Sequence, residues 1–534
     1  MRAVSKSPRT AAWQAKATGA LPKTAGALVG LLFLSPLAYL AIEATRAGSL
    51  SSIAEAQAIR PLLRSLLLAT AVATITVLVG TALAWLATRS DIPGRRILAV
   101  AAALPLAIPS FVAAAALRAA LGVGGLIPWL PRPSGFWGAL VVLVVVTYPY
   151  VYLPVAAALV TTPPDVEDAA RLLGDTPYRM VRSVIVPQIR PATVSGALIV
   201  FLYVLSDFGA VSLMRYDTLT RQIYSSRLAD TDTALALGLL LGGLALAAAT
   251  VERRLSRSRA PYNSARKPRS YQLGRTRWPV FAVVASFLGT VIAAPAVVFL
   301  VWWLRSSLAA GSTYPSLAES LAALVTPGLN TVVAACVAGL SAAVLLLPAA
   351  YLAAGRESRV GFFASTAIAS AFAVPGLVLA LAVVYWVVQA PAVVASLYQT
   401  FPLLILVYVL HFGVQSHRTS VAAIAGLPRK YREAARMLGA GRFRRFATVD
   451  VPLIGPGVLA GGGLVLLSVA KELPATLLLA PTGFDTLATR VWNAAEGGFL
   501  GDVGVTSLGL LLLSGTLTWV LVLRPMQRNI SPAD

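Results

Sequence analysis

The stretch EDAARLLGDTPYRMVRSVIVPQIRP, residues 167–191, places several charges in a chain that is otherwise strongly apolar. A very similar stretch, REAARMLGAGRFRRFATVDVPLIGP, follows at residues 432–456. Asp168 aligns with Glu433 at an offset of 265 residues (433 − 168), and the two stretches stay in register without a gap along their whole length. Self-similarity of this kind indicates an internal duplication of the chain.

The duplication extends well beyond these two stretches. Pro109, in LAIPSFV, aligns with Pro375, in FAVPGLV, at an offset of 266 residues (375 − 109). Tyr216, in YDTLT, aligns with Phe484, in FDTLA, at an offset of 268 residues (484 − 216). Since the offset changes only slightly along the chain, the repeat covers most of each half, with small insertions in the loops.

Long apolar segments dominate the composition. Of the 534 residues, 57% are hydrophobic and only 12% are charged, whereas soluble globular proteins contain about 25% charged residues. Apolar runs of about 20 residues are long enough for a helix to span a bilayer. We therefore predict an all-α polytopic membrane protein with twelve transmembrane helices in two groups of six. The runs lie at 24–45, 65–88, 98–120, 136–160, 192–214 and 231–251, and then at 278–303, 329–354, 361–389, 398–416, 456–480 and 503–524.

Charges in the loops predict the topology. The segment 252–277 contains nine Lys and Arg residues and one Glu, and an excess of cationic residues marks cytoplasmic loops. An even number of spans in each half gives the halves the same orientation, as parallel repeats, and places both termini in the cytoplasm. The expected parts are a tail at 1–23, a six-span domain at 24–251, a basic linker at 252–277, a second six-span domain at 278–524 and a tail at 525–534.

The basic linker also allows another interpretation, as a patch that binds anionic lipid or nucleic acid. The formal charge of +23 is better explained by cytoplasmic loops that follow the positive-inside rule. We therefore expect membrane lipid, and no nucleic acid, among the partners of the chain.

The charged stretches predict two short helices joined at a glycine. Pro163 or Pro164 suits the first helical position, and Glu167 and Asp168 follow in the first turn, where the helix dipole favours anions. Gly174 then ends the helix as a residue with positive φ, and a second short helix leads to Pro187. The second stretch repeats this design, with Glu433, Gly439 and Pro452 at the matching positions.

Such an elbow, present twice and expected on the cytoplasmic face, is typical of a docking device for another protein. The small side chains of Ala169, Ala170, Ala434 and Ala435 allow a partner to approach closely. The alternative is an amphipathic helix that lies on the membrane surface. The residues by themselves leave both interpretations open.

Three charged residues fall inside predicted spans. Asp207 lies in the fifth span, and Lys471 and Glu472 lie at the matching place in the eleventh. A charge at the bilayer centre costs about 2.5–3.5 kcal/mol, so such residues usually face the bundle interior or a pathway. They are candidates for a translocation pathway, or they support helix breaks near Gly209 and Pro474. Alternatively they are hydrated near the outer interface, where Lys471 and Glu472 partly neutralise each other.

An acidic residue, two alanines, a glycine six residues after the acid and a distal proline together resemble the EAA loop of ABC importer permeases. The chain resembles in particular the ferric-iron permeases, in which two six-span permease domains are fused. SDFGAVSL (206–213) and KELPATLLLAPTGFDTLATRVW (471–492) carry this likeness. The matching loop residues are Asp168 with Glu167 before it, Ala169, Ala170, Gly174 and Pro187, and then Glu433, Ala434, Ala435, Gly439 and Pro452. Asp168 stands where the family has Glu, so either Glu167 or Asp168 could be the acidic contact.

The resemblance implies a permease of the bacterial inner membrane that imports ferric iron. Two cytoplasmic ABC ATPase subunits would dock on the loops, and a periplasmic binding protein would deliver the substrate. ATP would be used by the partner subunits, since the chain contains no G-x-x-x-x-G-K-[ST] phosphate loop. The chain itself is expected to be a transport subunit and not an enzyme, with no catalytic, cofactor or metal site of its own.

Other functions fit parts of the same pattern. A different cargo, thiamine or another small solute, is compatible with the same permease role. A secondary transporter also has twelve spans in two parallel halves, but it does not require paired docking loops. An intramembrane enzyme would need a nucleophile with its base, or a cluster of metal ligands, and neither pattern occurs in the sequence.

Overall fold

The computed structural model describes residues 8–46, 56–122, 124–162, 164–255, 270–308, 316–355 and 358–523. Throughout these ranges the elements are helices, apart from one bridge pair between Ser90 and Tyr271. The predicted all-α fold is thereby confirmed. The predicted tail at 525–534 and much of the predicted linker at 252–277 lie outside the described residues.

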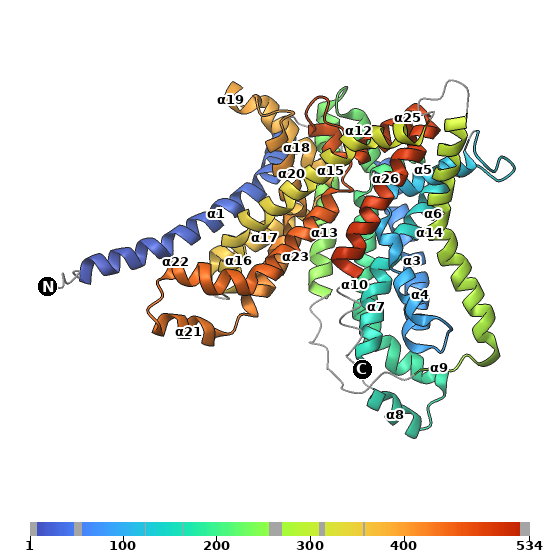
Figure 1. Cartoon of the computed structure of the whole chain (residues 1–534), viewed down its shortest axis with the longest axis horizontal. Helices are drawn as coiled ribbons and strands as arrows, with labels where there is room; N and C mark the ends of the chain where they lie inside the picture. Colours follow the sequence, from blue (N-terminus) through green and yellow to red (C-terminus); the bar gives the residue numbers. More distant parts are fainter. Residues whose placement is uncertain are drawn as a thin grey trace. The chain divides into compact units, whose positions relative to one another are not determined.

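Contacts between helices divide the chain into two compact units, and Figure 1 labels most of their α-helices. Unit 1 comprises Met1–Glu43 and Leu329–Phe484, and unit 2 comprises Ala44–Gly328 and Asp485–Asp534. Unit 1 contains α1 (Pro8–Arg46), most of α15 (Leu317–Leu345), α16 (Leu347–Ala354), α17 (Arg359–Ala373), α18 (Gly376–Gln389), α19 (Ala392–Ala395), α20 (Phe401–Ala425), α21 (Arg429–Met437), α22 (Arg442–Arg445), η4 (Phe446–Asp450), α23 (Val451–Val469) and α24 (Pro474–Leu479).

Unit 2 holds the remaining elements. They are α3 (Ala56–Arg89), α4 (Arg95–Ala101), η1 (Leu104–Ala107), α5 (Ser110–Leu121), α6 (Gly135–Thr147), α7 (Pro149–Thr161), α8 (Pro164–Leu172), α9 (Pro177–Met180), η2 (Val181–Ile185), α10 (Val186–Ser206), α11 (Gly209–Leu213), α12 (Leu219–Ser226), α13 (Thr231–Leu255), η3 (Gly274–Thr276), α14 (Arg277–Leu308), α25 (Leu487–Gly497), α26 (Leu500–Thr518) and η5 (Trp519–Leu523).

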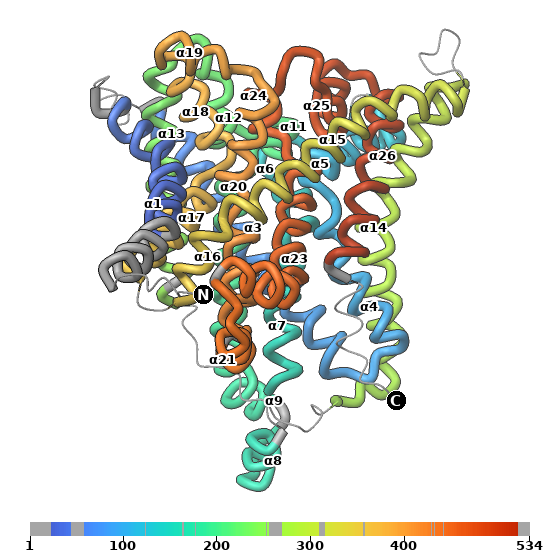
Figure 2. Tube along the Cα trace, turned by 60° about the vertical axis from the view of Figure 1, so that its left-hand side comes forward, coloured from blue at the N-terminus to red at the C-terminus, as the bar shows by residue number. Residues whose placement is uncertain are grey.

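The two units cut across the two sequence repeats. In unit 1, α1 from the first half packs on helices of the second half, and the Tyr39 hydroxyl donates to Gln389 Oε1 at 2.8 Å. In unit 2, α14 from the second half packs along α26 and on α5 (Figure 2), and Trp302 Nε1 donates to the Ala119 carbonyl at 2.8 Å. The first half therefore contributes α1 to unit 1, and the second half contributes α14, α25 and α26 to unit 2.

Glycines allow the backbones of these exchanged helices to approach closely. A Cβ added at Gly30 of α1 would lie 3.2 Å from Ala364 Cα, and one added at Gly504 of α26 would lie 2.6 Å from the Phe299 carbonyl oxygen of α14. Small residues at helix contacts are typical of membrane bundles, where close packing replaces the hydrophobic effect as the driving force.

Two of the predicted spans are sharply bent at a proline. Arg95–Ala107 and Ser110–Leu121 meet at 92°, and Arg359–Ala373 and Gly376–Gln389 meet at 106°. The breaks lie at Pro109 and Pro375, which occupy matching positions of the repeat. A proline disfavours the helical conformation in the residue before it, and Ile108 and Val374 accordingly have extended ψ values of 116° and 135°.

The predicted number of twelve spans is not confirmed. Among the described residues, nine helices are long and apolar enough to cross a membrane, or up to eleven if each bent pair counts as one span. The run predicted at 398–416 corresponds to α20, which is not among them. Polar side chains dilute this helix, and they are paired within unit 1: Gln415 Nε2 donates to Ser468 Oγ, and His417 Nε2 lies 2.9 Å from Ser365 Oγ.

Candidate functional site

The first elbow, residues 164–185, turns at Gly174. The φ of Gly174 is +88°, in the left-handed region that favours glycine. The Gly174 N–H donates to the Arg171 carbonyl at 2.9 Å, and the Asp175 N–H donates to the Ala170 carbonyl at 3.0 Å. These two bonds form a Schellman ending, which satisfies carbonyls left free at the end of α8. The predicted helix stop at Gly174 is confirmed.

The second elbow, residues 429–450, has the same construction. The φ of Gly439 is +74°. Its N–H donates to the Arg436 carbonyl at 3.0 Å, and the Ala440 N–H donates to the Ala435 carbonyl at 3.0 Å. Both elbows therefore hold their two short helices at a fixed angle by the same backbone hydrogen bonds, as the duplication predicts.

Each elbow joins the following long helix through a π turn. The Val186 N–H donates to the Val181 carbonyl, and the Val451 N–H donates to the Phe446 carbonyl, each five residues back. The predicted prolines Pro187 and Pro452 follow directly. Because a proline has no N–H and clashes with the carbonyl four residues earlier, the wider π turn accommodates it. The prolines thus stand at the joint between elbow and span.

The tips of the elbows expose pairs of large apolar side chains. Leu172 and Leu173 are 89% and 87% exposed, and Met437 and Leu438, at the matching positions, are 89% and 87% exposed. Sequence reasoning did not single out these four residues. The signal was present, because an apolar pair directly precedes the glycine of a short charged helix in both repeats.

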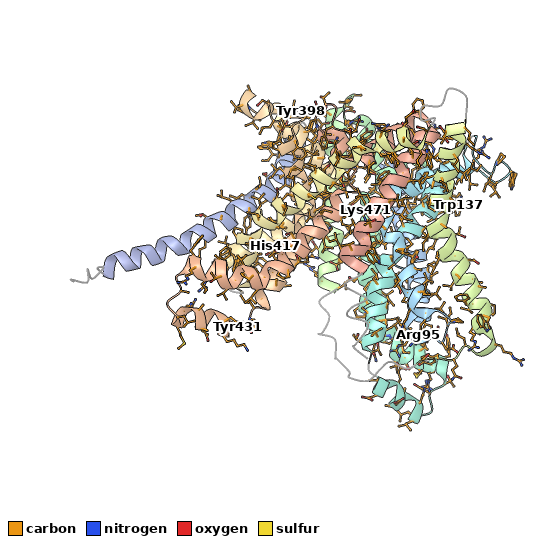
Figure 3. All side chains as sticks on the ribbon, viewed as in Figure 1. Arg95, Trp137, Tyr398, His417, Tyr431 and Lys471 are labelled. Carbon is orange, nitrogen blue, oxygen red and sulfur yellow. The ribbon has the colours of Figure 1, made fainter. Side chains whose placement is uncertain are left out.

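The two alanines of each elbow have different environments. Ala170 and Ala435 are buried, with exposures of 7% and 8%, whereas Ala169 and Ala434 are exposed. Only the first alanine of each pair can therefore meet a partner in this arrangement. Tyr431 of α21, labelled in Figure 3, is also exposed on the second elbow.

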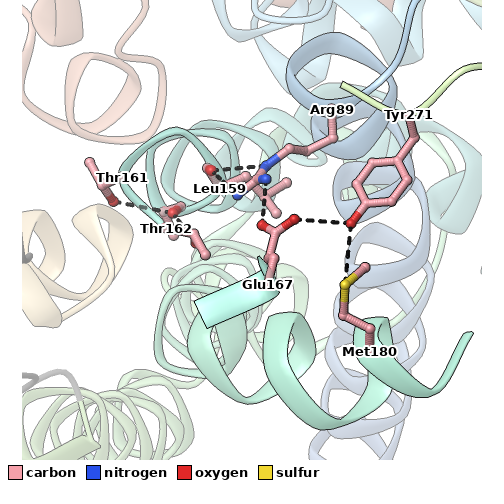
Figure 4. A network of polar contacts seen from close by, with 8 residues as sticks. Arg89, Leu159, Thr161, Thr162, Glu167, Met180 and Tyr271 are labelled. Carbon is pink, nitrogen blue, oxygen red and sulfur yellow. Dashed lines mark hydrogen bonds and ion pairs between the residues drawn. The ribbon is translucent and has the colours of Figure 1, made fainter. Parts of the chain in front are cut away.

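Glu167 is fully buried at the base of the first elbow (Figure 4). Its Oε1 accepts a hydrogen bond from Arg89 Nη1 at 2.6 Å, and both side chains have no exposed surface. Its Oε2 accepts a hydrogen bond from the Tyr271 hydroxyl at 3.0 Å. The same hydroxyl lies 3.9 Å from Met180 Sδ in α9, across the elbow.

Arg89 also fixes the end of α7. Its Nε and Nη2 donate to the Leu159 carbonyl at 3.1 Å and 2.7 Å. This carbonyl is among the last four of the helix, which have no partner within the helix, and a cation is favourable at that end of the helix dipole. One guanidinium therefore connects α3, α7 and α8.

Glu167 and Asp168, either of which could be the acidic contact of the first elbow, have different environments in the structure. Glu167 is occupied inside the chain by Arg89 and Tyr271. Asp168 is half-buried, and its counterpart Glu433 is exposed on α21. The acids at the aligned positions, Asp168 and Glu433, are therefore the ones closer to the surface.

Asp207 lies in a helix break and connects two broken helices. It is 7% exposed, and its Oδ1 accepts hydrogen bonds from the Ala210 and Val211 N–H groups at 3.0 Å and 3.3 Å, which caps α11. Its Oδ2 accepts a hydrogen bond from the hydroxyl of Ser110, the first residue of α5 after the bend. These contacts are those of a residue that supports the helix breaks.

Glu472 has the matching position in the other repeat, with a compensating change in its neighbour. Its Oε1 accepts a hydrogen bond from the Ala475 N–H at 3.1 Å, at the start of α24. Gly376 aligns with Ser110, and a Cβ there would lie 3.4 Å from Glu472 Oε1. The longer acid is thus paired with the smaller neighbour. Lys471, labelled in Figure 3, precedes it and is half-buried.

Comparison with known proteins places this geometry in a family. Residues 78–259 and 346–532 both match the family described as "Binding-protein-dependent transport system inner membrane component". A Fe(3+)-transport system permease protein, FbpB 2 of Haemophilus influenzae, is 28% identical over 509 residues, covering 92% of this chain and 96% of that protein.

Relatives with other names match shorter parts of the chain. The sulfate transport system permease protein CysT of Escherichia coli is 33% identical over 25% of this chain and 50% of its own length. The molybdenum transport system permease protein ModB of Mycobacterium bovis is 32% identical over 40% of this chain and 86% of its own length. Because the family matches well over half of the chain, and does so twice, the chain belongs to the binding-protein-dependent transport system inner membrane components and contains two fused permease domains.

Proposed function

We propose that this ABC importer permease carries ferric iron across the bacterial inner membrane. The observation that carries the proposal is the extent of similarity to the Fe(3+)-transport permease, which runs along 92% of this chain and 96% of the relative. The sulfate and molybdenum permeases match 25% and 40% of the chain. Only the first of these likenesses extends over both fused domains.

The two elbows are the proposed docking sites for cytoplasmic ATPase subunits. The exposed pairs Leu172–Leu173 and Met437–Leu438 directly precede the glycine turn of each elbow. Burying a large apolar side chain contributes about 1.5–3 kcal/mol, so four such side chains favour protein contact over exposure to water. The acids Asp168 and Glu433 and the exposed alanines Ala169 and Ala434 lie on the same short helices.

Transport follows from movement of the docked elbows. ATP binding draws the two ATPase subunits together, and the elbows pass this motion through the π turns at Pro187 and Pro452 to α10 and α23. The spans then alternate between inward-facing and outward-facing states, which requires an external bias on a two-state element. A periplasmic binding protein delivers the iron, ATP is hydrolysed on the partner subunits, and this chain binds no cofactor.

The charged residues in the spans have separate proposed roles. Asp207 and Glu472 hold the broken helices that border the pathway, and Lys471 is a candidate lining residue. Both termini and the basic linker lie in the cytoplasm, where the linker's cations meet anionic lipid headgroups.

Uptake of labelled ferric iron tests the cargo directly. In cells that lack this gene we expect uptake to fall to the background level, and a plasmid copy of the gene to restore it. Insensitivity to a proton uncoupler, together with dependence on the partner ATPase, separates this permease from a secondary transporter. Unchanged iron uptake in the deletion strain contradicts the proposed cargo.

Sulfate or molybdate is the second candidate cargo. Permeases named for these anions are 33% and 32% identical to single stretches of this chain, against 28% for the iron permease. The same deletion strain decides between them, with labelled sulfate, molybdate and thiamine tested in parallel with iron.

A further inference from the structure

We propose that Tyr271, in the linker between the two halves, is a positioning residue that holds the first elbow, so that the linker takes part in coupling and the two elbows are held differently. The inference rests on the proposed role of the elbows as docking sites. Tyr271 and its neighbours form a strap, residues 270–273, that runs past the ends of α3 and α8.

The backbone of the strap is fixed to the end of α3. The Tyr271 N–H donates to the Arg89 carbonyl at 2.7 Å, and the Asp91 N–H donates to the Tyr271 carbonyl at 3.3 Å. The Leu273 N–H donates to Asp91 Oδ1 at 2.7 Å. These three hydrogen bonds hold the four-residue strap against the end of α3, although the strap is an extended segment outside any helix.

The side chain of Tyr271 reaches from α3 to the first elbow. Its ring centroid lies 5.1 Å from that of Trp85 on α3, and the Arg171 guanidinium carbon lies 5.7 Å from the ring centroid on the α8 side. Its hydroxyl donates to Glu167 Oε2 at 3.0 Å (Figure 4). Tyr271 therefore contacts both helices and the buried carboxylate between them.

The hydrogen bond between Tyr271 and Glu167 is expected to persist at neutral pH. Burial, and after it the Glu167 carboxylate, raises the pKa of the Tyr271 hydroxyl. The hydroxyl therefore stays protonated at neutral pH and donates to the carboxylate. Because Arg89 binds the other oxygen of Glu167, the strap and α3 meet at the carboxyl group of α8. The same guanidinium connects them to α7.

The residues of the second half that align with this network differ from it. Gly355 aligns with Arg89 (355 − 89 = 266) and Arg432 with Glu167 (432 − 167 = 265), and Arg356, next to Gly355, lies outside the described residues. Ile424 occupies the place of Leu159, and it packs with Ala350 and Ile454 in an apolar cluster. The second elbow has apolar packing at its base and an ion pair within the elbow, between Arg445 Nε and Asp450 Oδ2 at 3.8 Å. The first elbow has a buried polar network that reaches the strap.

Spin labels at the elbow tips test this difference. Cys336 is the only cysteine of the chain, so a Cys336→Ser background allows Leu172→Cys and, in a separate protein, Met437→Cys to be labelled. The two sites match in the repeat and are each 89% exposed. Tyr271→Phe then removes only the hydroxyl that donates to Glu167. The control, Tyr398→Phe, removes a hydroxyl from an exposed tyrosine that lies outside both elbows.

We expect Tyr271→Phe to raise the ratio of mobile to immobile label at residue 172 about tenfold, since a hydrogen bond to a charged group is lost. The ratio at residue 437, and both ratios in Tyr398→Phe, are expected to stay unchanged. A rise at neither tip, or an equal rise at both, overturns the proposal.

A second measurement connects the strap to coupling. In the full complex reconstituted with its ATPase and binding protein, Tyr271→Phe is expected to increase the ATP hydrolysed per substrate carried, while Tyr398→Phe does not. If the wild-type complex carries no substrate or binds no ATPase, the proposed function fails. The mobility of the spin labels at residues 172 and 437 then still tests whether Tyr271 holds the first elbow. If Tyr271→Phe increases label mobility at residue 172 but leaves the ATP hydrolysed per substrate unchanged, the strap takes no part in coupling. That result overturns this part of the proposal.

Discussion

Replacing Arg89 by methionine is expected to destabilise unit 2 by about 3–5 kcal/mol, because the buried Glu167 carboxylate loses its cation. Two further hydrogen bonds, from Nε and Nη2 to the Leu159 carbonyl, are lost with it. The midpoint of thermal unfolding of the purified chain, followed in detergent, measures the effect. A variant as stable as the wild type contradicts the role assigned to this ion pair.

The double variant Arg89→Met with Glu167→Met is the matched control. Buried ion pairs can often be replaced by apolar residues of similar size at little cost, whereas removal of one partner is strongly destabilising. We therefore expect the double variant to recover most of the lost stability. Equal losses in the single and double variants would contradict the role of the ion pair and assign the effect to packing and to the bonds with the Leu159 carbonyl.

Combining Glu433→Arg with Gly439→Pro is expected to reduce transport about a hundredfold, since proline is incompatible with the turn at a cost of about 3 kcal/mol or more. Proline requires a φ near −65°, while that of Gly439 is +74°. Glu433→Arg also reverses the charge of an exposed acid on α21. Substrate uptake and co-purification of the ATPase measure the two consequences.

Insertion into the membrane is expected to survive this change, because Glu433 and Gly439 lie outside the helices that are long and apolar enough to span. Gly455→Ala is a suitable control, since an added methyl group there meets no atom within 4 Å. Normal substrate uptake by the variant with both substitutions would contradict the docking hypothesis. Loss of the protein from the membrane would instead indicate a folding defect and not a coupling defect.

Features set by local chemistry could be predicted from the sequence. A glycine after a short charged helix predicts a left-handed stop, and Gly174 and Gly439 both have it. Apolar runs of sufficient length predict membrane helices, and the duplication predicts that both elbows share one construction. The glycine stop depends on residues within one or two helical turns, the spans on continuous runs of about 20 residues, and the second elbow on its likeness to the first.

Features that depend on contacts between residues far apart in the chain could not be predicted from the sequence. Glu167 and Asp168 are adjacent acids in the first turn of one helix, and only the structure distinguishes them. The difference is made by Arg89, 78 residues earlier, and Tyr271, 104 residues later. The exchange of first helices between the two halves likewise depends on long-range contacts, at Gly30 of α1 and between Trp302 and Ala119.

The number of spans is not decided by hydropathy alone. Pro109 and Pro375 lie inside apolar runs, and composition by itself does not reveal that each run bends by 92° or 106°. In α20, His417 and Gln415 lower the hydropathy of the helix, yet both side chains are bonded within the unit. Bends and internal pairing are properties of the packed structure.

Cross-linking from the elbow tips tests the central claim, that the two elbows are the docking sites of the ATPase subunits. A photoreactive amino acid is placed at Leu173 or Leu438, each 87% exposed, and, as a control, at Trp129, which is 78% exposed in the loop before α6. In membranes that contain the whole transporter, we predict a cross-linked product with the ATPase from both tips and none from Trp129. No product from either tip, or an equal yield from Trp129, would contradict the account.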